Sequence, residues 1–314
     1  MGNQEKAGLI LENVKKVMIG KEDVAKLVMT SILAGGHVLL EDVPGTGKTV
    51  MARTFAKSID SEFSRIQFTP DLLPSDVTGI HFYNQKESEF VLRKGPVFGN
   101  ILLADEINRA TPRTQSALLE CMEEHQVTID GETFVLGEPF VVIATQNPVE
   151  TTGTYPLPEA QLDRFLMKIH VGYLDQNEEV AMMERFQNAS PLSAIEAVCT
   201  GDDVVTMQNE VKEVYVHPSL MHYIAALVHE TRNLNGVAAG VSPRGTLTML
   251  NAVRAYAYLE GRNYVVPEDI QKLAVPVWAH RLVLQLGLTR EDNRERLIQD
   301  VLAQVEVPTE DWNK

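Results

Sequence analysis

A short glycine-containing loop limits the possible folds of this chain more than any other feature of its sequence. Residues 38–40 are apolar, residues 44–49 read Pro-Gly-Thr-Gly-Lys-Thr, and helix-forming residues follow from 50 to 58. Glycines let backbone N–H groups turn inward around phosphate oxygens, the lysine brings a positive charge, and the threonine hydroxyl can ligate magnesium. The order of strand, loop and helix therefore predicts a phosphate-binding loop.

The loop departs from the usual pattern at one position. The pattern Gly-x-x-x-x-Gly-Lys-Thr has glycine where this chain has Asp42, although the Gly-Thr-Gly-Lys core is intact. The alternative is a surface turn that holds no ligand. We expect the loop and the helical turn after it to hold a nucleotide through Pro44, Gly45, Thr46, Gly47, Lys48, Thr49 and Val50.

Further short apolar runs predict a parallel sheet in the first part of the chain. Separated by helical or loop segments, such runs suit strands that are buried on both faces. They lie at residues 63–68, 101–104, 140–144 and 165–171. After about Val171 the spacing of apolar residues becomes helical, at residues 178–186, 219–232, 243–260 and 267–284.

The length and composition are those of a globular protein with two domains. The chain has 314 residues, of which 44% are hydrophobic and 23% charged. We predict an α/β P-loop NTPase core over residues 1–190, with a parallel sheet flanked by helices. An all-helical C-terminal domain is predicted over residues 191–314.

The charge and the cysteine content exclude several classes of protein. A net charge of −15 argues against a protein that mainly neutralises nucleic-acid phosphates, so no nucleic-acid partner is expected. The two cysteines, Cys121 and Cys199, lie far apart, which suggests neither a disulfide framework nor a zinc site. Without a signal peptide or a membrane span in the sequence, we expect a cytoplasmic protein.

An acidic pair follows the apolar run at residues 101–104. Together with Thr49, Asp105 is placed to hold a magnesium ion, and Glu106 to polarise an attacking water. An apolar strand that ends in Asp-Glu is more often just the start of a capped helix. Its pairing with the upstream loop favours a hydrolytic site.

Five motifs together resemble MoxR-type AAA+ ATPases, in the same order and over nearly the whole chain. They are residues 41–49, residues 105–110 (Asp-Glu-Ile-Asn-Arg-Ala), residues 144–148 (Ala-Thr-Gln-Asn-Pro), residues 162–165 (Leu-Asp-Arg-Phe) and residues 242–245 (Ser-Pro-Arg-Gly). The resemblance implies an ATP-binding AAA+ core with a helical lid domain, and it implies roles for further residues.

Two of these residues would act on the γ-phosphate. Asn147 matches the sensor 1 position, where a neutral polar side chain holds water or phosphate; a turn asparagine before a proline is the alternative. Arg164 matches the arginine finger, which in AAA+ rings reaches into the site of the neighbouring subunit. A surface salt bridge is the alternative for Arg164.

The resemblance also assigns a lid residue and an adenine contact. Arg244 matches the sensor 2 arginine, which reports the γ-phosphate to the lid. A positive charge near a helix N-terminus is unfavourable beside the helix dipole unless an anion lies there. The position of Arg244 therefore favours a role in contacting an anion over a role as a plain surface charge. Ile19 and Gly20 match the segment that lines the adenine pocket, although a simple turn between helices explains them almost as well.

Two segments suit hairpins that AAA+ relatives insert near a central pore. Residues 76–91 and 127–134 alternate apolar and polar residues, the second around an Asp-Gly turn. The resemblance implies contact with substrate, and ordinary surface hairpins are an almost equal alternative. Arg109 and Arg113 could contact a neighbour's nucleotide, or they could simply be solvent-exposed charges on a helix.

The resemblance implies Mg²⁺-dependent ATP hydrolysis at the subunit interfaces of a homo-oligomeric ring, with six subunits in the family. The hydrolysis would drive remodelling, assembly or maturation of partner proteins, and a von Willebrand factor A domain protein is a candidate client. Two alternatives stay open: a nucleotide-gated scaffold that binds ATP without turnover, and a helicase-like ATPase that acts on nucleic acid.

Overall fold

The computed structural model describes residues 2–41, 45–148, 153–187, 190–285 and 291–308. The chain forms two compact units: residues 1–157 with 169–207 (unit 1), and residues 158–168 with 208–314 (unit 2). This division differs from the expected boundary at residue 190 in two segments, because 158–168 joins unit 2 and 191–207 joins unit 1. Composition marks where the chain changes character, whereas these units reflect contacts between residues far apart in sequence.

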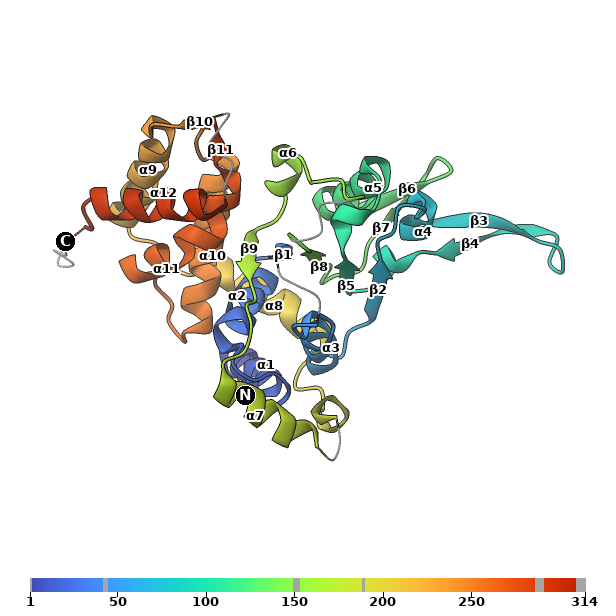
Figure 1. The fold of residues 1–314 in the computed structure, drawn as a ribbon. Coiled ribbons are helices and arrows are strands. Elements are labelled where there is room, and N and C mark those ends of the chain that lie inside the picture. Colours follow the sequence, from blue (N-terminus) through green and yellow to red (C-terminus); the bar gives the residue numbers. More distant parts are fainter. Residues whose placement is uncertain (1, 42–44, 149–152, 188–189, 286–290, 309–314) are drawn as a thin grey trace. The chain divides into compact units, whose positions relative to one another are not determined.

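A five-stranded sheet forms the centre of unit 1. The strands lie in the order β2-β5-β8-β1-β9, and the pairs β2–β5, β5–β8 and β8–β1 are parallel (Figure 1). β1, β5 and β8 are buried almost throughout, which explains their nearly continuous apolar sequences. The strands are β1 (Val38–Glu41), β2 (Phe63–Gln67), β5 (Ile101–Asp105), β8 (Val141–Gln146) and β9 (Met167–His170), whose first two residues count with unit 2.

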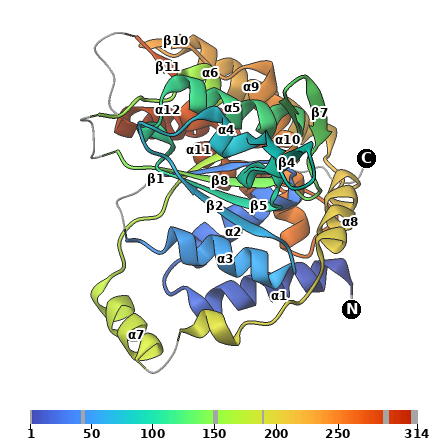
Figure 2. The same cartoon turned by 90° about the vertical axis from the view of Figure 1, so that its right-hand side faces the viewer.

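Helices cover both faces of this sheet, as Figure 2 shows: α1, α2 and α3 lie on one side, and α4 and α5 on the other. Each helix turns its buried residues toward the sheet or a neighbouring helix. The helices of unit 1 are α1 (Asn3–Val17), α2 (Glu22–Leu33), α3 (Lys48–Ser58), α4 (Pro74–Thr78), α5 (Pro112–Glu124) and α7 (Gln176–Phe186), and α8 (Gly201–Lys212) runs from unit 1 into unit 2.

Two antiparallel hairpins are inserted in unit 1. β3 (Gly79–Asn84) pairs with β4 (Glu89–Lys94) and extends away from the sheet (Figure 1). β6 (Gln126–Ile129) pairs with β7 (Glu132–Val135). Asp130 and Gly131 join them with positive φ angles, as a type I′ turn requires.

Unit 2 is helical and also contains one short antiparallel pair, β10 (Val237–Ala239) with β11 (Val283–Leu284), which the apolar spacing does not reveal. Its helices are α6 (Glu159–Leu162), α9 (Pro218–Asn233), α10 (Pro243–Leu259), α11 (Pro267–Trp278) and α12 (Glu291–Gln304). A 3₁₀ turn, η4 (Ala279–Arg281), follows α11. The predicted fold class, a P-loop NTPase core with a helical C-terminal domain, is confirmed.

Across the described ranges, every helix is too short or too polar to serve as a membrane span.

Candidate functional site

The predicted phosphate loop connects β1 to α3. Gly45 and Gly47 have φ angles of 90° and 88°, in the left-handed region that glycine adopts without strain. Gly47 caps α3, so Lys48 and Thr49 occupy its first turn. Backbone N–H groups without helical partners and the helix dipole make this end of α3 attractive to an anion. Pro44, expected to take part, lies outside the described residues, as does Asp42.

A polar cavity of about 430 Å³ opens beside this loop. The carboxyl ends of β2, β5 and β8 meet the loop at one edge of the sheet, where α/β folds place their ligand sites. This edge brings together the predicted residues Gly45, Gly47, Lys48, Thr49, Val50, Asp105, Glu106 and Asn147, and also Arg65, Gln67 and Thr145, which the sequence did not single out.

Two of these additional side chains hold Asp105. The Thr145 hydroxyl donates to Oδ1 of Asp105 over 2.7 Å and accepts the N–H of Glu106 over 2.8 Å. Nη2 of Arg65 donates to Oδ2 of Asp105 over 2.8 Å. The cavity thus offers a carboxylate and the Thr49 hydroxyl, oxygen donors of the kind that Mg²⁺ prefers alongside nucleotide phosphates. The donor set fits the predicted magnesium site.

Glu106 is held in an uncommon backbone conformation. Its φ angle is 55°, in the left-handed region that few residues other than glycine occupy. Nε2 of Gln67 donates to Oε2 of Glu106 over 2.8 Å, and Nη1 of Arg109 donates to the same oxygen over 3.0 Å. In this structure Arg109 therefore pairs with the carboxylate beside it, and no neighbouring chain is needed for that contact.

Asn147 directly follows β8 and is buried on the wall of the cavity. Its carbonyl oxygen lies 3.4 Å from Nδ2 of Asn108, the donor. The end of β8 thus places both Asn147 and Thr145 opposite the loop.

An apolar cavity of about 340 Å³ adjoins the polar one, and Gly45, Gly47 and Val50 line both. Thr46 lines the apolar cavity only. Predominantly apolar cavities of this size suit a nucleobase. The other walls come from the end of α1, from the segment after β9 and from α7: Val17, Met18, Ile19, Lys21, Gly172, Tyr173, Leu174, Glu179, Met182 and Phe186.

Ile19 therefore lies where the resemblance implied, while Gly20 is set back from the lining. Gly20 has a φ angle of 63°, and a Cβ there would lie 2.2 Å from Oε1 of Glu178. Lys21 positions another wall, because its buried Nζ donates to the carbonyl oxygens of Val171, Gly172 and Tyr173. Neither contact is visible in the sequence.

The remaining predicted residues, Arg164 and Arg244, belong to unit 2. Arg164 directly precedes Phe165 in the turn after α6. Arg244 is the second residue of α10, after Ser242, whose hydroxyl accepts the N–H of Gly245 over 3.2 Å, and Pro243. Their roles at the nucleotide stay predictions.

Two family models match the chain. One, described as "ATPase family associated with various cellular activities (AAA)", matches residues 37–167, and the other, "AAA lid domain", matches residues 229–301. The first range contains the phosphate loop, the acidic pair and Asn147. The second contains Arg244.

Relatives match over nearly the full chain. Chaperone MoxR1 of Mycobacterium tuberculosis is 44% identical over 94% of this chain and 80% of that protein. Protein MoxR of Paracoccus denitrificans is 31% identical, with 90% and 89% covered. The crystal structure of a Cytophaga hutchinsonii protein assigned as an ATPase has a TM-score of 0.90 and 41% identity, covering 98% of this chain and 96% of that one.

Proposed function

Because the chain belongs to the MoxR family of AAA+ ATPases, we propose that it hydrolyses ATP with Mg²⁺ at the subunit interfaces of a ring, and that hydrolysis drives the remodelling or maturation of partner proteins. The observation that carries the proposal is the pair of adjoining cavities in unit 1. One is apolar and suits adenine, the other is polar and suits phosphates and a metal ion, and the phosphate loop forms part of both.

Each residue of the polar cavity has a role in this proposal. Lys48 and the first N–H groups of α3 bind phosphate oxygens, and Thr49 and Asp105 would hold the metal ion, which neutralises charge on the phosphates. Glu106 accepts the proton of the attacking water, and Asn147 orients that water against the γ-phosphate. Thr145, Arg65 and Gln67 position the two carboxylates.

We propose a ring because the nucleotide site is expected to need an arginine from a neighbouring subunit. Arg164 would act as an arginine finger on a neighbour's nucleotide, where it stabilises negative charge on the transferred phosphoryl group. Arg244 would report the γ-phosphate to the lid. Hydrolysis would then need an oligomer, with six subunits as the family implies.

A protein client is proposed from the name of the relative Chaperone MoxR1 and from the exposed hairpin of unit 1. The β3–β4 hairpin exposes Phe82, Tyr83 and Phe90, the last with 72% of its surface accessible. Such side chains suit contact with an apolar polypeptide surface. A von Willebrand factor A domain protein in the cytoplasm is the proposed client.

Two substitutions test the hydrolytic site. Lys48→Ala should remove phosphate binding, and Glu106→Gln should keep ATP binding but lower phosphate release at least about 100-fold, since a general base contributes that much or more. Lys15→Ala and Glu124→Gln make the same chemical changes at exposed positions and should leave the rate unchanged. Release that is independent of Mg²⁺, or equal in the site variants and the wild type, would overturn the proposal.

The same variants separate the two alternatives. Tight ATP binding by the wild type, with single-turnover hydrolysis at background level, would identify a scaffold. Glu106→Gln should also trap the ATP-bound form with its client, so a pull-down should recover a defined protein. Recovery of nucleic acid alone would favour the helicase-like alternative.

A further inference from the structure

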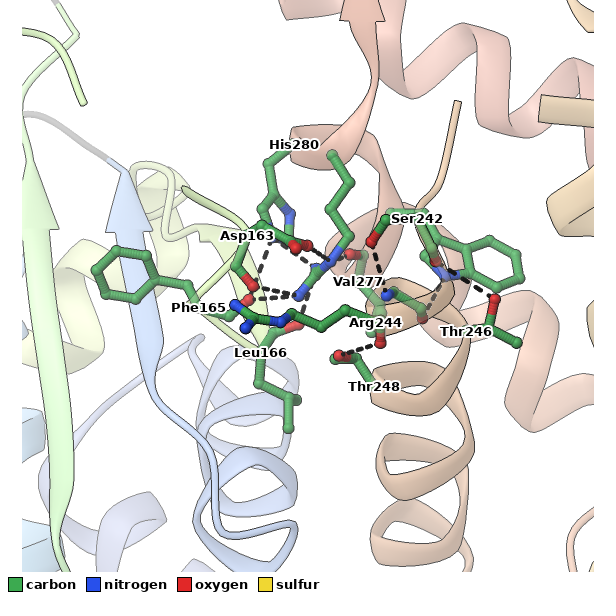
Figure 3. A network of polar contacts seen from close by, with 12 residues as sticks. Asp163, Phe165, Leu166, Ser242, Arg244, Thr246, Thr248, Val277 and His280 are labelled. Atoms are coloured by element: carbon green, nitrogen blue, oxygen red, sulfur yellow. Dashed lines mark hydrogen bonds and ion pairs between the residues drawn. The ribbon is translucent and has the colours of Figure 1, made fainter. Parts of the chain in front are cut away.

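Arg281 contacts Asp163, Phe165 and Leu166 in a buried polar network of unit 2, and Figure 3 labels these three partners. It ends η4, and only 2% of its side chain is exposed. A buried guanidinium is costly unless carboxylates and carbonyl oxygens satisfy its donors. Here the satisfying oxygens come from the segment that carries Arg164 and from Val277 of α11, and the aliphatic part of the side chain lies beside the start of α10, which carries Arg244.

The first segment is the turn that contains Arg164. Nε of Arg281 lies 2.7 Å from Oδ1 of Asp163 in an ion pair. Nη2 donates to the carbonyl oxygens of Phe165 over 2.7 Å and of Asp163 over 3.2 Å, and Nη1 to that of Leu166 over 3.4 Å. Because these partners flank Arg164 on both sides, they fix the backbone from which its side chain extends.

The second segment is the first turn of α10, which contains Arg244. A Cβ added to Gly245 would lie 2.6 Å from Cγ1 of Val241 and 3.0 Å from Cδ of Arg281, so the glycine leaves space that both side chains use. Nε1 of Trp278 donates to the Gly245 carbonyl over 3.1 Å. Figure 3 shows Arg244 extending from α10 toward the side of the network where Phe165 and Leu166 lie.

Only arginine supplies this set of bonds. Its planar fork directs donors to several acceptors at once, whereas lysine has a single charged nitrogen. Burial lowers the pKa of Arg281 to about 10, with the Asp163 carboxylate acting in the opposite direction, so the guanidinium stays charged at neutral pH. Another ion pair joins the same segment to α12, where Nη2 of Arg294 lies 3.3 Å from Oε1 of Glu159.

We infer that Arg281 is a positioning residue that holds the Arg164 turn and the Arg244 helix start in one rigid body. Every displacement of the helical unit during the ATPase cycle then moves both arginines together. The inference rests on the proposed function, in which Arg164 and Arg244 act on nucleotide.

The first test replaces Arg281 with lysine. Arg281→Lys should lower kcat about tenfold while the affinity for ADP changes less than about twofold, because the two cavities belong to unit 1. The matched control is Arg262→Lys, which alters another arginine–carboxylate pair of unit 2, Arg262 with Asp269 at 2.6 Å. Equal kcat values for Arg281→Lys and Arg262→Lys would overturn the inference.

A double-mutant cycle of Arg281 with Arg164 shows whether Arg281 acts through Arg164. In an Arg164→Ala background, Arg281→Lys should lower kcat by less than the roughly tenfold loss expected in the wild type, because its effect through Arg164 is already lost and only its effect through Arg244 remains. Full additivity would contradict the positioning role. Wild-type kcat in Arg164→Ala would instead count against the finger assignment, and so against the proposed function.

Amide hydrogen exchange provides a readout that does not depend on hydrolysis. Arg281→Lys should speed exchange in residues 158–168 at least about tenfold and leave β1 and β8 unchanged. If Arg281→Lys fails to fold, Gly245→Ala is the second variant, since alanine suits a helix but its Cβ would crowd both Val241 and Arg281. Unchanged exchange of residues 158–168 in a folded variant would overturn the inference.

Discussion

Two side chains hold one oxygen of the Glu106 carboxylate. Gln67 approaches from the end of β2, and Arg109 from the turn after β5. A carboxylate bound in this way has few rotamers to choose from, and its direction is fixed before water arrives. Gln67 therefore matters for hydrolysis although it carries no charge.

Removing that contact should slow hydrolysis without weakening binding. We expect Gln67→Leu to lower kcat about tenfold, because the Glu106 carboxylate becomes free to turn away from the attacking water. Nucleotide affinity, measured by titration with ADP, should change less than about twofold. Gln304→Leu makes the same change at the exposed end of α12 and is the control. A Gln67→Leu rate within twofold of the wild type would contradict this role.

His37 makes the stability of the protein depend on pH. Its buried ring accepts the Val142 N–H at Nδ1, and its Nε2 lies 3.0 Å from the Met122 carbonyl, as suits the neutral tautomer. Burial lowers the pKa of His37 from 6.5 to about 4. The unfolded chain therefore takes up the proton first, and stability is complete above pH 6.5 and is lost as the pH falls toward 4.

The loss should reach about 3 kcal/mol at most, from 1.36 kcal/mol per pKa unit. It can be measured as the urea midpoint at pH 7, 6, 5 and 4.5. His37→Gln keeps a donor and an acceptor but does not titrate, so its midpoint should fall less over this range. Burial also lowers the pKa of His280, but His280 is present in both proteins, so its contribution to the pH dependence cancels in the comparison. Identical pH dependence would show that His37 is not responsible.

Local sequence predicted those site residues that belong to one continuous motif. Gly45, Lys48, Thr49, Asp105 and Glu106 stand in short patterns with a known chemistry, and the structure brings them to one cavity. Arg65, Gln67 and Thr145 have no such pattern. They reach the site only because β2 and β8 flank β5, and strand order is not written in any single segment.

At the scale of elements, α7 connects helix capping to the apolar cavity. Glu178 accepts the Asp175 N–H over 2.8 Å, Asp175 accepts the Glu178 N–H over 2.8 Å, and this capping box begins the helix that supplies Met182 and Phe186 to the cavity. Gly20 lies directly against the Glu178 carboxylate. A side chain at position 20 would therefore disturb the start of α7.

Gly20→Ala should weaken ADP binding about tenfold, because Glu178 must leave its capping position and α7 shifts at the cavity wall. Gly35→Ala is the matched control. Gly35 has nearly the same φ angle, 68° against 63°, but a Cβ there meets no atom within 4 Å. Both substitutions introduce similar backbone strain, so equal ADP affinities of the two variants would show that the Glu178 contact is unimportant.

Element boundaries differ from the sequence expectations where local chemistry overrides periodicity. Residues 76–78 were expected to begin a hairpin, but Pro74 at the first helical position and the Asp76 carboxylate, which accepts the Leu73 N–H, begin the short helix α4. The helix expected to reach residue 284 ends at Trp278. There the 3₁₀ turn of η4 carries Arg281 to its partners.

At the scale of the whole molecule, the sequence predicted the two kinds of architecture but not which unit owns each segment. Residues 158–168 follow the α/β motifs directly, yet they belong to the helical unit. Contacts with side chains more than a hundred residues later join the segment to this unit, those of Arg281, His280 and Arg294 among them. Apolar periodicity contains no information about such a contact.

The adjoining cavities have a consequence for how a nucleotide gains affinity. Gly45, Gly47 and Val50 line both, so a base and a phosphate chain bound there lie within one molecule's length of each other. Once one half of the ligand is bound, the other half is present at a high effective concentration and loses little further translational entropy. Adenosine or triphosphate alone lacks this advantage, so a covalent link between two weakly held fragments produces the tight ligand.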